Sequence, residues 1–220
     1  MHASRTLSVV LSLLGALSLA GVSSAQTSMD LGGGWRATIF DPDHVSLTVV
    51  SVDVANNLLT LRKEATFLEI DPFTGRPQPI NISFTQTAPD GATITRFAID
   101  EELLTNQTGV AWDQFDQVLV DSNQAVFNQS LSAGFGITPF TSRSYNGAST
   151  AVSFTGGIIP DGGNWNPGSA GAGGGELVWD VNLSSPNPVT FSLKEIPVPA
   201  PGGVALMGLA AAVAAGRRRR

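Results

Sequence analysis

The sequence of 220 residues contains no cysteine. Disulfide bonds, thiolate metal ligands and cysteine nucleophiles are therefore excluded for this chain. A domain without disulfides has to be held together by its hydrophobic core, and the chain is long enough to bury one. The 24 glycines and 13 prolines favour many short elements joined by turns over a few long helices.

Basic residues are scarce between the two ends of the chain. Of the 12 lysines and arginines, one is Arg5 and four occupy positions 217–220, which leaves seven in the central region. All 18 acidic residues lie in that region, so its net charge is −11. Phosphate backbones repel such a domain, and we expect no nucleic-acid partner.

Histidine occurs only at His2 and His44. In the segment Asp41-Pro42-Asp43-His44 the histidine reads as a turn residue, with a role as ligand or general base as the alternative. No Gly-x-Ser-x-Gly nucleophile elbow is present, and nothing points to a Ser-His-Asp triad built on His44.

The N-terminus has the three parts of a secretory signal peptide. A short leader with Arg5 precedes an apolar run over residues 7–19, and Ser23-Ser24-Ala25 supplies the small residues that signal peptidase reads. We expect residues 1–25 to form a signal helix that is cleaved after Ala25, which leaves Gln26 as the mature N-terminus. An uncleaved N-terminal anchor is the alternative.

The C-terminus, residues 197–220, also has three parts in a fixed order. The segment Val198-Pro199-Ala200-Pro201-Gly202 comes first, and a small apolar stretch over residues 203–216 follows. At about 1.5 Å per residue this stretch spans only about 20 Å, less than the hydrocarbon core of about 30 Å. The chain then ends in Arg217, Arg218, Arg219 and Arg220, which favour the cytoplasmic side as a membrane stop. A short, transient transmembrane helix is expected.

This tail resembles the PEP-CTERM sorting signal, which combines a Pro-Glu-Pro-like motif, a short transmembrane helix and a terminal basic cluster. Pro199 and Pro201 match the two prolines, and Ala200 stands where the family has glutamate. The resemblance implies processing near Pro199, Ala200, Pro201 and Gly202 by an exosortase-like transpeptidase, after export to the cell envelope or surface. The alternative is an ordinary tail anchor that stays in place.

The region 26–196 shows the alternation of half-buried strands. Ile80, Ile82 and Phe84 alternate, as do Val45, Leu47 and Val49 before the parity switches at Val50. This switch indicates either a β-bulge or a strand that is buried on both faces. Roughly eight to ten short strands predict an antiparallel two-layer β-sandwich, jelly-roll or immunoglobulin-like. A helical turn is expected at residues 100–104 and a long mobile loop at residues 156–175.

Candidate catalytic and metal-binding residues are few. Glu101, Glu102, Asp113 and Asp116 are the carboxylates that a glycoside hydrolase could pair, but their spacing also suits a solvated acidic face. Asp41 with Asp43, or Asp161 with Asn164, could hold Ca²⁺, although turn formation explains them more simply. We therefore expect no catalytic residue, no metal and no cofactor.

Aromatic residues give one further hypothesis. The turn Asn106-Gln107-Thr108-Gly109 leads into a strand with Trp112, which we expect to pack in or at the edge of the core. Trp165, in the glycine-rich stretch, is the best candidate for an exposed aromatic residue that stacks on a sugar. The four Asn-x-Ser/Thr sequons are read as coincidence; they begin at Asn81, Asn106, Asn128 and Asn182.

The sequence as a whole predicts an exported, non-enzymatic surface or matrix protein. Its expected partners are signal peptidase, an exosortase-like enzyme, the membrane during sorting, and extracellular polysaccharide. A carbohydrate-binding or adhesive module and a secreted glycoside hydrolase are the alternatives.

Overall fold

The computed structural model describes residues 26–68, 70–71, 74–120, 124–168, 174–184 and 188–201. Over these ranges the chain is all-β, as expected. The strands are β1 (Thr27–Gly32), β2 (Trp35–Ile39), β3 (Val45–Asp53), β4 (Leu58–Phe67), β5 (Ile80–Gln86), β6 (Arg96–Asn106), β7 (Trp112–Val120), β8 (Ala125–Phe127), β9 (Ser142–Tyr145), β10 (Ala151–Ile159), β11 (Asn164–Trp165), β12 (Leu177–Val181) and β13 (Thr190–Pro199), with a 3-10 helix η1 (Asp90–Ala92) between β5 and β6. The expected signal helix and C-terminal transmembrane helix lie outside the described residues.

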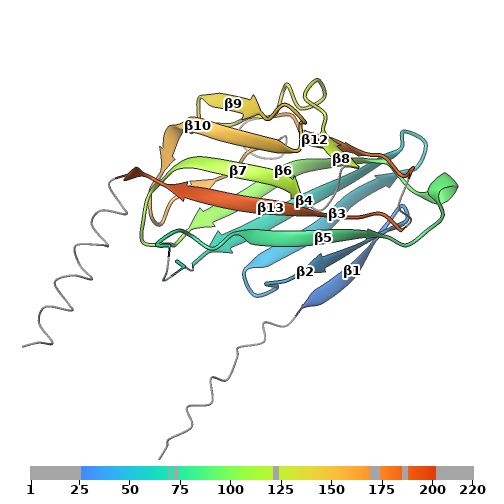
Figure 1. Ribbon diagram of the computed structural model, residues 1–220, viewed down its shortest axis with the longest axis horizontal. Coiled ribbons are helices and arrows are strands. Elements are labelled where there is room, and N and C mark those ends of the chain that lie inside the picture. The colour runs from blue at the N-terminus through green and yellow to red at the C-terminus, as the bar shows by residue number, and fades with distance from the viewer. Residues whose placement is uncertain are drawn as a thin grey trace, which may run out of the picture.

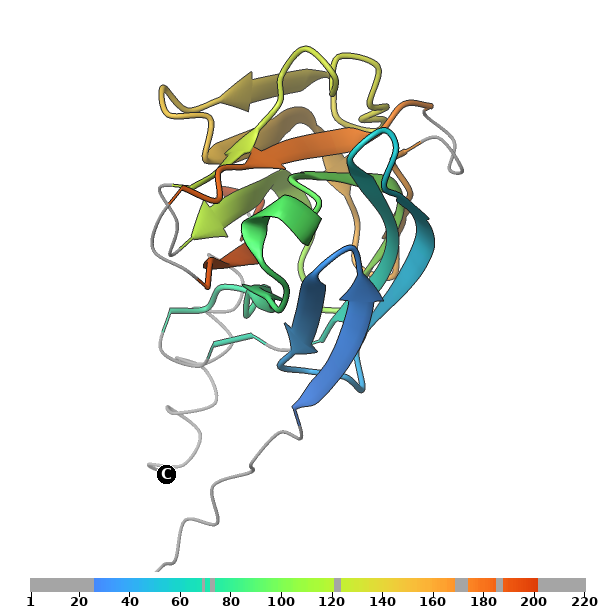
Figure 2. The same cartoon turned by 90° about the vertical axis from the view of Figure 1, so that its right-hand side faces the viewer.

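The strands form two sheets that pack against each other as a sandwich (Figure 1). Sheet A has the order β1-β2-β5-β13-β7-β10-β9, and sheet B has the order β3-β4-β6-β12-β8, with β11 paired beside β6. Figure 2 shows β1 and β9 at opposite edges of sheet A. Strand β13 occupies the middle of sheet A, between β5 and β7.

Strand pairing is antiparallel with one exception among the described strands. β4 and β6 run parallel, with Leu58 opposite Arg96 and Phe67 opposite Asn106. The chain leaves sheet B after β4, contributes β5 to sheet A, and returns as β6. The parallel pair corrects the expectation of a purely antiparallel sandwich. Parallel neighbours require a long connection, and here the connection includes β5 of the other sheet.

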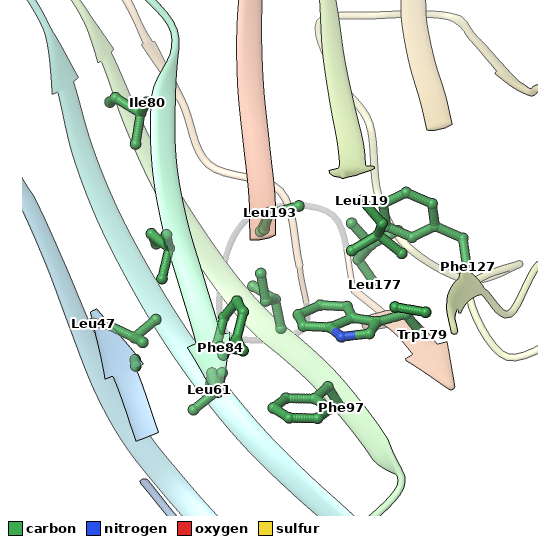
Figure 3. Close-up of a cluster of buried hydrophobic side chains, with 14 of the residues drawn as sticks. Leu47, Leu61, Ile80, Phe84, Phe97, Leu119, Phe127, Leu177, Trp179 and Leu193 are labelled. Atoms are coloured by element: carbon green, nitrogen blue, oxygen red, sulfur yellow. The ribbon is translucent and has the colours of Figure 1, made fainter. Parts of the chain in front are cut away.

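The core forms where the inward faces of the two sheets meet. Figure 3 shows Phe84 of sheet A beside Phe97 and Trp179 of sheet B. Phe97 and Trp179 stack at 5.3 Å with an interplanar angle of 8°, and Phe84 meets the edge of Phe97 at 5.5 Å. Such aromatic pairs add to the stabilisation from apolar burial. The predicted alternation of Ile80, Ile82 and Phe84 is confirmed, since all three are buried.

A β-bulge in β3 and another in β6 decide which residues of these two strands face inward. The parity switch predicted in β3 is confirmed as a register shift between Val49 and Ser51, and it leaves Val50 exposed. In β6, Ile99 pairs with Leu61 and Glu101 pairs with Arg62, so Asp100 is the extra residue. The helical turn expected at residues 100–104 is therefore wrong. Here a bulge, and not a helix, breaks the alternation.

The glycine-rich stretch is also more ordered than expected. The predicted loop at residues 156–175 contains the end of β10 and all of β11, although residues 169–173 lie outside the described ranges. Gly157 has to be glycine because a Cβ there would overlap the carbonyl group of Pro139. Glycine in this stretch permits close packing of the backbone as well as turns.

The turn between β6 and β7 is organised by a buried asparagine. Asn106 is fully buried, and its side-chain amide donates to the carbonyl oxygens of Val110, Ile159 and Pro160 at 2.8, 3.1 and 3.1 Å. Its Oδ1 accepts from the hydroxyl of Thr108 at 2.7 Å. The predicted turn and the predicted core position of Trp112 are confirmed. The Asn106 side chain is thus a structural bridge, closed to modification in the folded domain.

We predict that truncating the centre of the core costs far more stability than truncating the surface. Phe97→Ala should lower the free energy of unfolding by about 3–5 kcal/mol, because a large cavity remains between the sheets. Val54→Ala is the matched control, since Val54 is 76% exposed, and it should change the value by less than about 0.5 kcal/mol. Urea denaturation of both variants measures the difference, and equal costs would contradict the described core.

Candidate functional site

Four polar side chains meet in the closed space between the two sheets. Lys63 on β4 and Glu102 on β6 come from sheet B, and Gln117 on β7 and Glu195 on β13 come from sheet A. Each has an exposed fraction of no more than 1%. We refer to these four residues as the buried cluster.

Each member of the buried cluster occupies an inward-facing position of its strand. Lys63, Gln117 and Glu195 are in phase with buried apolar neighbours two residues away. These neighbours are Leu61 and Ala65 in β4, Phe115 and Leu119 in β7, and Leu193 in β13. Glu102 reaches the same layer because the bulge at Asp100 shifts the alternation of β6. The sequence predicted Glu102 as a candidate carboxylate but not Lys63, Gln117 or Glu195. The signal that could have revealed these three is a polar residue at a position whose neighbours two residues away are apolar.

The buried cluster is densely hydrogen-bonded. Lys63 Nζ lies 2.7 Å from Glu195 Oε2 and 3.8 Å from Glu102 Oε1. Gln117 Nε2 donates to both oxygens of Glu102, at 2.7 and 2.8 Å, and to Glu195 Oε1 at 3.0 Å. The amide of Gln117 thus contacts the carboxyl groups of both Glu102 and Glu195, which lie beside the amine of Lys63. These contacts pair the amine, the amide nitrogen and the two carboxyl groups, whose burial alone would be strongly unfavourable. Gln117 Oε1 is buried without a hydrogen-bond partner among the described residues.

The charge of the cluster is set by the protonation of Glu102. Burial raises the pKa of Glu102 from 4.5 to about 8, the charge of Lys63 opposes this shift, and the charge of Glu195 adds to it. At neutral pH Glu102 is therefore largely protonated. The remaining charges, on Lys63 and Glu195, cancel, so the closed space holds no net charge.

The chemistry available to the buried cluster follows from its closure. The cluster places a carboxylic acid that keeps its proton at neutral pH beside an amine and a second carboxyl group. These are the groups that proton transfer and acyl transfer use. The exposed fractions of 1% or less leave no route for an external substrate in the folded domain as described. Any reaction of these side chains in the closed domain would therefore involve only members of the cluster.

The other expected carboxylates do not join this site. Glu101 Oε2 lies 2.7 Å from Arg62 Nε in an ion pair at the surface of sheet B. Asp116 accepts from Gln114 Nε2 at 2.8 and 3.0 Å. Asp113 lines an open depression of about 560 Å³ together with Gln114, Thr155, Gly156, Gly157 and Ile158. The structure does not bring these carboxylates together with Glu102.

The expected turn residues behave as turns. His44 Nδ1 lies 2.9 Å from Asp41 Oδ2, three residues earlier, and the carbonyl oxygen of Asp41 accepts from the backbone N–H of Val45 at 3.0 Å. Asp161 Oδ1 accepts from the backbone N–H of Gly109 at 2.9 Å, and Asn164 is exposed on β11. Over the described ranges no three His, Asp or Glu side chains are grouped so that they could hold a metal ion.

Trp165 is not the exposed aromatic residue that the sequence predicts. It has no exposed surface and packs edge-on against Phe140 at 5.0 Å and Phe154 at 5.1 Å. The glycine-rich stretch folds over the core and carries this side chain inward. Trp35, Trp112 and Trp179 are equally buried, so all four tryptophans belong to the core.

The predicted processing residues lie at the two ends of the domain. Gln26 is exposed directly before β1, and Ala25 falls outside the described residues. Pro199 is the buried last residue of β13, and the backbone N–H of Ala200 donates to the carbonyl oxygen of Ala111 at 2.8 Å. Pro201 is exposed. Gly202 and the membrane-stop residues Arg217, Arg218, Arg219 and Arg220 also fall outside the described residues.

The prolines at the end of β13 stand where the strand has lost a neighbour. Pairing with β5 ends at Glu195 opposite Ile80, whereas pairing with β7 continues to Pro199 opposite Trp112. Backbone N–H groups alternate sides along a strand, and that of Ala200 points toward β7. The nitrogens of Pro197 and Pro199 therefore face the unpaired side, where a missing N–H costs no hydrogen bond. Strand β13 thus runs across the expected domain boundary at residue 196 and into the motif.

The chain matches no protein-family model, no curated protein and no solved structure at a significant level. Within the part of the chain that the structure describes, no helix has the length and apolar character needed to cross a membrane.

We predict a specific pH dependence of stability from Glu102. Above pH 4.5 the unfolded chain loses this proton, while the folded chain keeps it until about pH 8. The unfolded state then binds fewer protons, so the free energy of unfolding falls as pH rises through this window, by up to about 1.4 kcal/mol per pH unit. Glu102→Gln removes this contribution.

Urea denaturation of wild type and Glu102→Gln between pH 5 and pH 8 measures the effect. The stability of the wild type relative to the variant should decline across the window. Parallel pH profiles would show that Glu102 titrates normally and that the cluster is not closed.

Proposed function

We propose that this chain is the precursor of an exported protein whose β-sandwich domain is placed on the cell surface or in the extracellular matrix by an exosortase-like transpeptidase. The observation that supports this most strongly is the tail, with its motif at Pro199-Ala200-Pro201, its apolar stretch and its four terminal arginines in fixed order. The signal-like N-terminus and the lack of cysteine suit the same route. The domain itself is non-enzymatic in this proposal.

The end of the folded domain and the start of the sorting tail coincide. Pro199 is buried in β13 and Ala200 is bonded to Ala111, so the motif begins inside sheet A with no linker. A transpeptidase has to bind its substrate as an accessible, extended segment. Processing between 199 and 202 then requires the last residues of β13 to detach from β7, which the absence of a β5 partner beyond Glu195 makes easier.

The rival functions receive less support. Four buried tryptophans leave no tryptophan platform on which a sugar could stack, which weakens the case for a carbohydrate-binding module. Of the four carboxylates that a hydrolase could pair, Glu102 is enclosed in the core and Glu101 is bound to Arg62. For the topology of the sandwich we propose a jelly-roll or immunoglobulin-like arrangement. The parallel β4–β6 pair departs from the immunoglobulin pattern.

We predict that changing the motif blocks processing without blocking export. Full-length protein with Pro199→Ala and Pro201→Ala should accumulate in the membrane fraction at precursor size, because the enzyme reads these prolines. Replacing Arg217, Arg218, Arg219 and Arg220 with glutamine should have a different effect. Each arginine resists insertion by about 2.5–3.5 kcal/mol, so without them the short tail should slip from the membrane unprocessed.

Pro197→Ala is the matched control, since Pro197 is also a buried proline of β13 but lies before the motif. Fractionation and immunoblotting of the three variants in the native host provide the measurement. Normal processing and release of the double proline variant would refute the sorting proposal and leave a permanent tail anchor in its place.

A further inference from the structure

The buried cluster contains an amine and a carboxyl group in contact, closed off from water. Lys63 Nζ is 2.7 Å from Glu195 Oε2, which places the carboxyl carbon of Glu195 one bond beyond the contact. Neither side chain is exposed by more than 1%. Two reacting groups fixed in this way have effective concentrations of about 10⁵–10⁸ M, far above what free solutes reach.

We propose that Lys63 and Glu195 form an intramolecular amide bond, an isopeptide cross-link between β4 and β13, with Glu102 as the group that transfers the protons. The inference is independent of the proposed sorting, because it concerns only side chains inside the domain.

The surroundings of the pair suit the reaction. Gln117 Nε2 holds Glu195 Oε1 at 3.0 Å and Glu102 Oε1 at 2.7 Å, so the two carboxyl groups are fixed relative to each other. Glu102 Oε1 lies 3.8 Å from the attacking nitrogen. Burial keeps Glu102 protonated, with a pKa of about 8. A neutral acid next to both reacting groups is what proton transfer to a leaving hydroxyl requires.

The steps balance without any added reagent. Lys63 first passes a proton to Glu195 across their hydrogen bond, which gives a neutral amine and a neutral carboxylic acid. The amine nitrogen then attacks the carboxyl carbon of Glu195 and forms the C–N bond. Glu102 donates its proton to the departing hydroxyl group and receives one from the nitrogen, so a water molecule leaves and Glu102 ends as it began. Nothing is oxidised or reduced.

The cross-link would replace a charged pair with a neutral amide. Two charges taken out of water are costly even when paired, and the amide removes both. Exclusion of water also opposes hydrolysis, the reverse reaction. The bond joins residues 132 positions apart and links the two sheets, in a chain that has no cysteine with which to make a disulfide. It would restrict the unfolded chain as a disulfide does.

The direct test is the mass of the full-length wild-type chain, purified and then denatured. We expect a mass lower than the sequence mass, corrected for any processing at the termini, by one water molecule. Trypsin cannot cut after an acylated lysine, so the peptide that begins at Lys63 should appear joined to the peptide that begins at Glu195. An unchanged mass would overturn the proposal. A loss of one ammonia, with the link at Gln117, would overturn the assignment to Glu195.

Variants separate the roles of the residues. Lys63→Arg should abolish the loss of water, whereas Lys194→Arg, the matched control on the outer face of β13, should retain it. In Glu102→Gln the cross-link should form about 10²–10⁴-fold more slowly, so uncross-linked chain should be present at purification and decline on incubation. Glu102→Met places an apolar side chain in the same space and gives a second variant should the first not fold. Complete cross-linking in a folded Glu102 variant would contradict its role in proton transfer.

Discussion

The contact between Lys63 and Glu195 is the constraint on which the relative placement of the two sheets depends. One partner lies in sheet B and the other in sheet A, and neither reaches solvent. Leaving either charge unpaired in the core would cost about 3–5 kcal/mol, a large part of the stability of a domain. The sheets therefore have to meet with β4 opposite β13. The bulge at Asp100 turns Glu102 toward this pair, and the amide of Gln117 donates a hydrogen bond to Glu102. Glu102 then adds no net charge, because it keeps its proton.

Strand β13 connects this interior to the expected function. It lies in the middle of sheet A, carries Glu195 at the centre of the buried cluster and ends at Pro199, where the tail motif begins. The part of the strand near Glu195 is paired on both sides, and the part beyond it is paired only with β7. Strand β13 thus has two hydrogen-bonded neighbours up to Glu195 and one, β7, from there to the motif. This difference suits the proposed processing, in which the end of the strand is presented to an enzyme while the fold stays intact.

Much of the fold could be predicted from the sequence because most strands are half-buried and alternate. Ile80, Ile82 and Phe84, and the bulge after Val49, were predicted on that basis and are confirmed. Prediction failed where long-range packing decides the outcome. The bulge in β6 breaks the strand alternation, so the sequence pattern there resembles that of a helical turn. The glycine-rich stretch allows Trp165 to pack into the core. Most of the buried cluster was missed for a related reason: a lysine within a strand reads as a surface residue until the partners from three other strands are known.

A double-mutant cycle on Lys63→Met and Glu195→Met tests most directly whether this contact governs the fold, and it does so whether or not the amide forms. Each single change should lower the free energy of unfolding by about 3–5 kcal/mol, because it leaves the other charge unpaired in the core. The double variant, with two apolar side chains of suitable size, should lose much less than the sum, which gives a coupling energy of at least about 2 kcal/mol. Single costs that add to within about 0.5 kcal/mol would show that the two residues act independently, and would contradict the central role of the contact.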